Sequence, residues 1–137
     1  MLRSFLLFAA VLLWAGCAVQ AQKAVPEAVQ ATFNEKFPKA DDVEWKLEAD
    51  GNWEVEFELD DEESSATFSA EGKWLETETE IAKDDLPDAV RKAVQGQKVK
   101  EAARILKADG TTVYEVEIGK KDLIYDANGQ LLLEEKD

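Results

Sequence analysis

The sequence predicts an α+β fold built from two tandem repeats, each a helix followed by four antiparallel strands. Two observations carry this prediction. Segments 53–57 and 114–118 both alternate large apolar residues with glutamate, which is the pattern of a strand with one buried and one solvated face. In addition, a helical segment, a glycine turn and an alternating segment follow one another twice along the chain, as expected for a duplicated unit.

Residues 1–21 have the composition of a secretory signal peptide. Arg3 precedes an apolar run over 5–15, which is shorter than the ~20 residues of a membrane span. Val19-Gln20-Ala21 supplies a cleavage pattern, so we expect the mature chain to begin at Gln22. The alternatives are a lipoprotein signal that lipidates Cys17 and an uncleaved anchor. We therefore expect a periplasmic or secreted protein, with a lipid anchor through Cys17 as the alternative, and one domain over 22–137.

The charge balance and the missing residue types exclude several classes of function. The formal net charge is −14, which disfavours binding to nucleic acid or anionic lipid. The chain has no histidine, and its one cysteine lies in the leader. Serine–histidine and cysteine–histidine nucleophiles and Cys/His zinc sites are then absent after cleavage. We expect that the protein is not an enzyme and binds no cofactor. We also expect that no stable membrane span remains once the leader is removed.

The first repeat, residues 25–81, opens with a predicted helix over 25–37. Its apolar residues recur at steps of four and form one stripe. Pro26 suits the first helical turn, and Pro38 ends the helix. Four strands follow, and Asp50-Gly51-Asn52 has the chemistry of a tight turn between the first two. The predicted strands are 43–49, 53–60, 65–70 and 73–80. The alternation does not decide which face Trp74 takes.

The second repeat, residues 86–137, restarts the pattern. Leu86-Pro87-Asp88-Ala89-Val90 matches Val25-Pro26-Glu27-Ala28-Val29, and we expect Asp84 and Asp85 to cap this helix and Gly96 to end it. Segment 114–118 aligns with 53–57, and Asn128-Gly129 predicts the last hairpin. Short connections imply antiparallel strands. The result would be a sheet of about eight strands with both helices packed on one face.

These paired motifs resemble the PepSY-like family of small bacterial envelope proteins, which share the fold of the beta-lactamase inhibitor protein. The resemblance rests on the two helix starts, on Asp50-Gly51 with Asp109-Gly110, and on the Phe68-to-Gly72 and Tyr125-to-Gly129 turns. It spans residues 25–137 and implies a structural scaffold with loosely inhibitory or protein-binding roles. It supplies no catalytic residue. The second repeat departs from the pattern at Arg104, where the first has Trp45.

Acidic side chains on the solvated faces of the strands form the candidate partner-binding face. Such a face suits a basic envelope protein, because complementary charge speeds and orients docking; an ordinary solvated surface is the simpler interpretation. A cation- or small-ligand-binding protein is the alternative function, with calcium at the turn over 60–63. We expect Trp53 and Tyr114 to pack in the core. The candidate face consists of Glu44, Glu54, Glu56, Glu58, Glu115 and Glu117.

Overall fold

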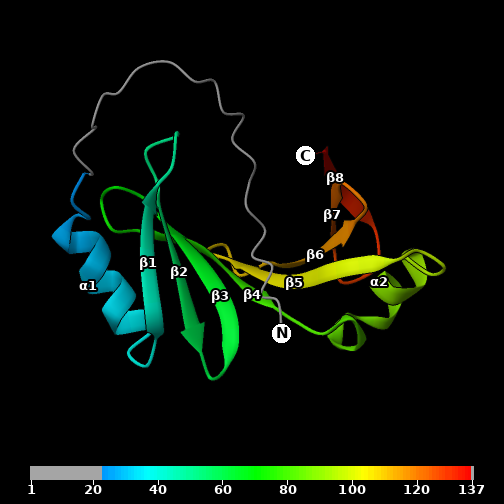
Figure 1. The fold of residues 1–137 in the computed structure, drawn as a ribbon. Coiled ribbons are helices and arrows are strands. Elements are labelled where there is room, and N and C mark those ends of the chain that lie inside the picture. Colours follow the sequence, from blue (N-terminus) through cyan, green and yellow to red (C-terminus); the bar gives the residue numbers. More distant parts are fainter. Residues whose placement is uncertain (1–22, 137) are drawn as a thin grey trace, which may run out of the picture.

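The computed structural model describes residues 23–136, so the predicted signal peptide, the cleavage after Ala21 and the lipidation of Cys17 lie outside the described residues. The described chain forms an eight-stranded antiparallel sheet in the order β1 to β8, with two α-helices (Figure 1). The predicted α+β class is confirmed. No helix between residues 23 and 136 is long and apolar enough to cross a membrane. The elements are α1 (Glu27–Lys36), β1 (Asp41–Leu47), β2 (Trp53–Leu59), β3 (Glu62–Phe68), β4 (Trp74–Glu80), a 3₁₀ turn (Lys83–Asp85), α2 (Asp88–Ala93), β5 (Val99–Lys107), β6 (Thr112–Ile118), β7 (Lys121–Tyr125) and β8 (Leu131–Lys136).

The first helix buries the predicted stripe against the first four strands. Val29 is fully buried, and Phe33 is 3% exposed. The Phe33 ring meets the rings of Trp45 and Phe57 edge to face, each with centroids 5.2 Å apart. Such aromatic pairs add to the energy of burial itself. Trp53, Val55 and Phe68 complete this first core.

The second helix is shorter than predicted and lacks the predicted caps. It ends at Ala93, and Pro87 occupies its N-cap position without a side-chain hydrogen bond. Asp84 and Asp85 instead lie in the preceding 3₁₀ turn. The reason is Pro87, which holds Leu86 in an extended conformation and moves the aspartates away from the free N–H groups. Leu86, Val90 and Val94 still build the second core, with residues from β5, β6 and β7.

Both helices cover the same face of the sheet. Residues directly opposite one another on neighbouring strands point to the same side. One such row runs Phe57, Ser64, Thr79, Arg104 and Tyr114 across five strands. Phe57 belongs to the core under α1, and Tyr114 packs against the core under α2. Figure 1 shows the helices at the two ends of the curved sheet.

A β-bulge settles the orientation of Trp74. Phe68 pairs with Trp74, whereas the preceding Thr67 pairs with Glu76, so one extra residue is accommodated in β4. This extra residue turns Trp74 to the helix-bearing face. The indole N–H of Trp74 donates to Thr77 Oγ1 at 2.9 Å, and Lys36 Nζ lies 3.7 Å from the ring centroid. The simple alternation of the sequence could not reveal this change of side.

Strand pairing relates Tyr114 to the first repeat in two ways. Against the following strand, Tyr114 lies opposite Tyr125 as Trp53 lies opposite Phe68, which agrees with the predicted match of Tyr114 with Trp53. Against the preceding strand, Tyr114 lies opposite Arg104 as Val55 lies opposite Trp45. The first two strands of the second repeat are therefore shifted by two residues relative to their counterparts in the first repeat.

Candidate functional site

Among residues 23–136, both helices lie on one face of the sheet, and we call the other face the open face. It carries the side chains that alternate with the core residues of each strand. All six glutamates predicted for the partner-binding face point to it. On β1 and β2, Glu44 lies opposite Glu56, and Glu58 follows on the same side. On β6, Glu115 and Glu117 flank the core residue Val116 and therefore point away from α2.

The structure adds carboxylates that the sequence analysis left out of the site. The joining of the repeats through β4 and β5 places further acids between the two predicted groups. Glu80 lies opposite Ala103, which in turn lies opposite Glu115. The acidic side of β4 was visible in its alternation, but its place at the centre of the sheet was not. The added residues are Glu63, Glu76, Glu78, Glu80, Glu101, Asp122 and Glu135.

Several residues of the open face are buried although neither α1 nor α2 covers it. Ile105 is 6% exposed, Val113 7%, and the carboxylate residues Glu117 and Asp122 only 7% and 8%. The open face is therefore not a flat, fully solvated surface. Polar groups here are partly withdrawn from water. Charge on them is more costly than on a flat surface.

Glu78 lies at the centre of this region. Burial is the main reason that its pKa is raised from 4.5 to about 7, and the nearby carboxylates of Glu76, Glu54, Asp122 and Glu101 raise it further. Both causes act in the same direction, because each disfavours the ionised form. Its neutral form therefore persists to a higher pH than that of an exposed glutamate.

Glu115 shows the same effect more strongly. Burial raises its pKa to about 8, and Glu78, Asp122, Glu135 and Glu117 contribute repulsion. Glu78 stands on β4 in the row that continues through Ile105, and Glu115 stands on β6 in the next row, beside Ala103 of β5. The two strongest effects therefore belong to neighbouring positions on one surface.

Burial and acidic neighbours also raise the pKa values of other carboxyl groups on the open face. Burial raises the pKa of Glu101, and Glu117 adds to the effect. Burial also raises the pKa of Glu80, with Glu63 as its acidic neighbour. For Glu54, burial again comes first, followed by a hydrogen bond with Glu48. Five carboxyl groups on this face thus resist ionisation.

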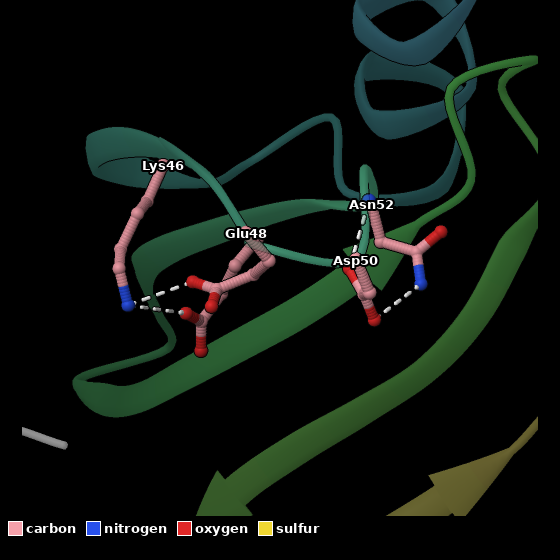
Figure 2. Close-up of polar contacts among 5 residues, drawn as sticks. Lys46, Glu48, Asp50 and Asn52 are labelled. Carbon is pink, nitrogen blue, oxygen red and sulfur yellow. Dashed lines mark hydrogen bonds and ion pairs between the residues drawn. The ribbon is translucent and has the colours of Figure 1, made fainter. Parts of the chain in front are cut away.

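Basic side chains neutralise the periphery of the open face. Lys46 Nζ lies 2.7 Å from Glu48 and 3.7 Å from Glu54, beside the Asp50–Asn52 turn (Figure 2). Lys100 Nζ lies 3.0 Å from Glu117. Among the ion pairs of residues 23–136, none involves Glu78 or Glu115. The centre of the face therefore keeps its acidic repulsion.

The turn proposed for calcium is a tight hairpin connection. Asp60 and Asp61 both have positive φ angles, 53° and 65°, and join β2 to β3. Within the described residues, no group of three or more histidine, cysteine, aspartate or glutamate side chains is arranged to hold a metal ion.

The two aromatic residues that we expect in the core lie on the helix-bearing face of the sheet. Trp53 is 3% exposed in the first core, and Tyr114 is partly buried against the second. The prediction of core packing is confirmed for both. The open face is therefore dominated by carboxylates rather than by aromatic anchors.

Comparison with known proteins identifies one family. The family described as "Putative beta-lactamase-inhibitor-like, PepSY-like" matches residues 16–64 and 51–133. A DUF2874 family protein from Bacteroides ovatus has a similar structure, with a TM-score of 0.75 and 23% identity over 84% of this chain and 89% of that chain. A BLIP-like protein from Bacteroides fragilis gives a TM-score of 0.72 and 23% identity over 84% and 88%. The search of curated proteins gave no match.

A third solved structure is also similar to this chain. It comes from Bacteroides eggerthii and is described as one of the "putative periplasmic proteins" of that organism, with a TM-score of 0.75 and 16% identity over 83% of this chain and 90% of that chain. At these identities the structural likeness establishes the fold.

Proposed function

Because this chain belongs to the PepSY-like, beta-lactamase-inhibitor-like family, we propose that it is a periplasmic, non-enzymatic binding module. Its open face would dock a basic region of another protein and thereby inhibit or sequester that protein. The family description and the BLIP-like relative from Bacteroides fragilis favour an inhibitor-like role. The relative described as periplasmic favours the location.

The observation that carries the proposal is the pair Glu78 and Glu115 at the centre of the open face. Their pKa values of about 7 and 8 mean that ionisation there is opposed by burial and by other carboxylates. A lysine or arginine brought to this position relieves the repulsion and favours ionisation. A basic partner would therefore gain more here than on an ordinary acidic surface.

This arrangement also makes docking dependent on pH and salt. A cation that lowers the pKa of Glu78 and Glu115 makes them release protons on binding, so affinity should rise from pH 6 to pH 9. Salt should weaken the encounter, since the Debye length falls from ~10 Å at 0.1 M to ~3 Å at 1 M. These two dependences together distinguish the open face from an apolar docking surface.

The experiment is affinity capture from envelope extract with three forms of the protein. The open-face variant is Glu54/Glu56/Glu58→Lys. The control variant, Glu27/Glu35/Glu62→Lys, makes the same charge change on exposed positions at α1 and the helix-bearing side of β3. Circular dichroism and thermal melts establish that all three forms are folded.

The proposal predicts a protein that the unaltered chain and the control recover and that the open-face variant loses. Its recovery should also fall at high salt. Recovery of the same proteins by all three forms would assign binding to another surface.

A further inference from the structure

Large exposed apolar side chains gather at the two edges of the sheet. Among residues 23–136, six large hydrophobic residues are exposed, and five of them lie on the edge strands β1 and β8. On β8 they are consecutive: Leu131, Leu132 and Leu133 are 46%, 51% and 49% exposed. On β1 they are Val43 and Leu47, at 39% and 40%. An exposed edge of this kind is a ready template for another strand.

Within the repeats, β8 is the counterpart of β4. The turn before β4 has hydrogen bonds from Ser69 N to Lys73 O and from Gly72 N to Ser69 O. The turn before β8 repeats them, from Asp126 N to Gln130 O and from Gly129 N to Asp126 O. Both strands then begin with the same bulge against the preceding strand. Glu76, Thr77 and Glu78 thus correspond to Leu133, Glu134 and Glu135.

In the same way, β1 is the counterpart of β5. Glu48 N donates to Asn52 O after β1, and Lys107 N donates to Thr111 O after β5. Within the chain, β4 is the last strand of the first repeat and pairs with β5, the first strand of the second repeat. The residues of β4 are mostly half-buried, whereas every residue of β8 is exposed. The difference is that β4 has β5 beside it, whereas β8 is an edge strand of the sheet over residues 23–136.

We propose that β8 of one molecule pairs antiparallel with β1 of a second copy of this chain, in the register of the internal β4–β5 junction. That register places Glu78 opposite Ile105 and Thr77 opposite Leu106. Carried over to the edges, it places Glu135 opposite Lys46 and Glu134 opposite Leu47. Glu135 and Lys46 both belong to the open face, so opposite charges would meet across the junction.

The two edges also have the backbone groups that this pairing needs. At the internal junction Ala108 N donates to Leu75 O, so alternate residues of β4 direct their backbone groups to β5. The corresponding residues of β8 are Leu132, Glu134 and Lys136. β1 carries a bulge between Asp41 and Glu44, but β5 has one between Val99 and Glu101 and still pairs with β4 beyond it.

The geometry fixes the kind of assembly and its salt dependence. A contact between different edges is heterologous, so it builds open chains of copies rather than a closed dimer. Each copy carries a net charge of −14, which opposes association. Salt screens this repulsion while leaving the strand pairing intact. Self-association should therefore strengthen as salt is raised, the reverse of docking to a basic partner.

Sedimentation of two matched variants tests the pairing. Glu134→Pro removes an N–H that points to the free edge, and Glu134→Ala keeps it; both remove the ion pair with Lys121. We expect the unaltered protein and Glu134→Ala to grow in average mass with concentration and salt. Glu134→Pro should need at least about tenfold higher concentration, equivalent to ~1.4 kcal/mol. A protein that stays monomeric at high salt, or equal association of both variants, would overturn the proposal.

Cysteine cross-linking tests the register and the identity of the edges. We expect a disulfide-linked dimer when Glu135→Cys and Lys46→Cys proteins are mixed and oxidised, since facing strand residues approach within disulfide reach. Each variant oxidised alone controls for Cys17. Glu134→Cys mixed with Lys46→Cys should not cross-link, because these side chains take opposite faces. A homodimer of Glu135→Cys, with no heterodimer in the mixture, would indicate β8–β8 pairing and refute the proposed edge.

Discussion

Replacing Glu115 with glutamine should stabilise the protein at alkaline pH. Glutamine keeps the shape of the neutral carboxyl group but cannot ionise. The folded-state pKa of Glu115 is about 8, against an ordinary value of 4.5. A raised pKa of this kind gives stability at low pH that is lost as the pH rises through 8. The unaltered protein should thus become less stable between pH 5 and pH 9, and Glu115→Gln should lose less.

The size of the effect follows from the same values. At ~1.36 kcal/mol per pH unit, a rise from 4.5 to about 8 sets a ceiling of roughly 5 kcal/mol. The side chain is partly exposed and its acidic neighbours titrate with it, so water and proton uptake relieve part of the repulsion. We expect Glu115→Gln to raise the free energy of unfolding by about 2 kcal/mol at pH 9 and by less than ~1 kcal/mol at pH 5.

Urea denaturation at pH 5 and pH 9 measures this difference. The matched control is Glu62→Gln, which removes the same charge from an exposed position on the helix-bearing side of β3. The control should change stability by no more than ~0.5 kcal/mol at either pH. A Glu115→Gln protein with the same pH dependence as the unaltered protein, or one that is destabilised at pH 9, would refute the reasoning.

Other variants probe the scaffold. Gly72→Ala should cost more than ~2 kcal/mol in thermal or urea unfolding, because Gly72 has a φ of 89° and an added Cβ would lie 2.7 Å from the carbonyl oxygen of Ala28. Gly51→Ala, at the same φ of 89° but in open space, should cost only about 1 kcal/mol, and equal losses would contradict the close approach to α1. Phe68→Ala, at a fully buried site, should cost about 3–5 kcal/mol, and a loss below ~1 kcal/mol would argue against the first core. Raising salt from 0.05 to 1 M should stabilise the unaltered protein at pH 9 more than Glu115→Gln, by screening the open face.

Much of the fold was predictable because the signals are local. Val29 and Phe33 recur at helical spacing, and the glycine turns mark the hairpins, so the helices, strands and duplication follow from neighbouring residues. The bulge after Trp74 was not predictable, since one inserted residue puts Trp74 on the opposite side from the one that simple alternation assigns. The missing cap at α2 has a similar origin, because Pro87 changed the path of the chain.

The candidate site was predictable only in its outer parts. Alternation placed Glu54, Glu56, Glu115 and Glu117 on a solvated side. Their electrostatic centre depends on Glu78, which lies in one row with Glu56 through β3 but is brought near Glu115 only because β4 pairs with β5. That junction joins strands from different repeats, and no local sequence pattern predicts which strand edges pair. The exposure of Val43 and Leu47 is a further non-local result, since it arises from the position of β1 at the edge.

The account rests on carboxyl groups that crowd one another on the open face and resist losing their protons. Carbon-13 NMR of the glutamate side-chain carboxyls, followed from pH 4 to pH 9, observes this directly. We predict titration midpoints near 7 and 8 for Glu78 and Glu115. Midpoints for both residues near the ordinary value of 4.5 would show that these carboxyls are solvated independently, and would contradict the account.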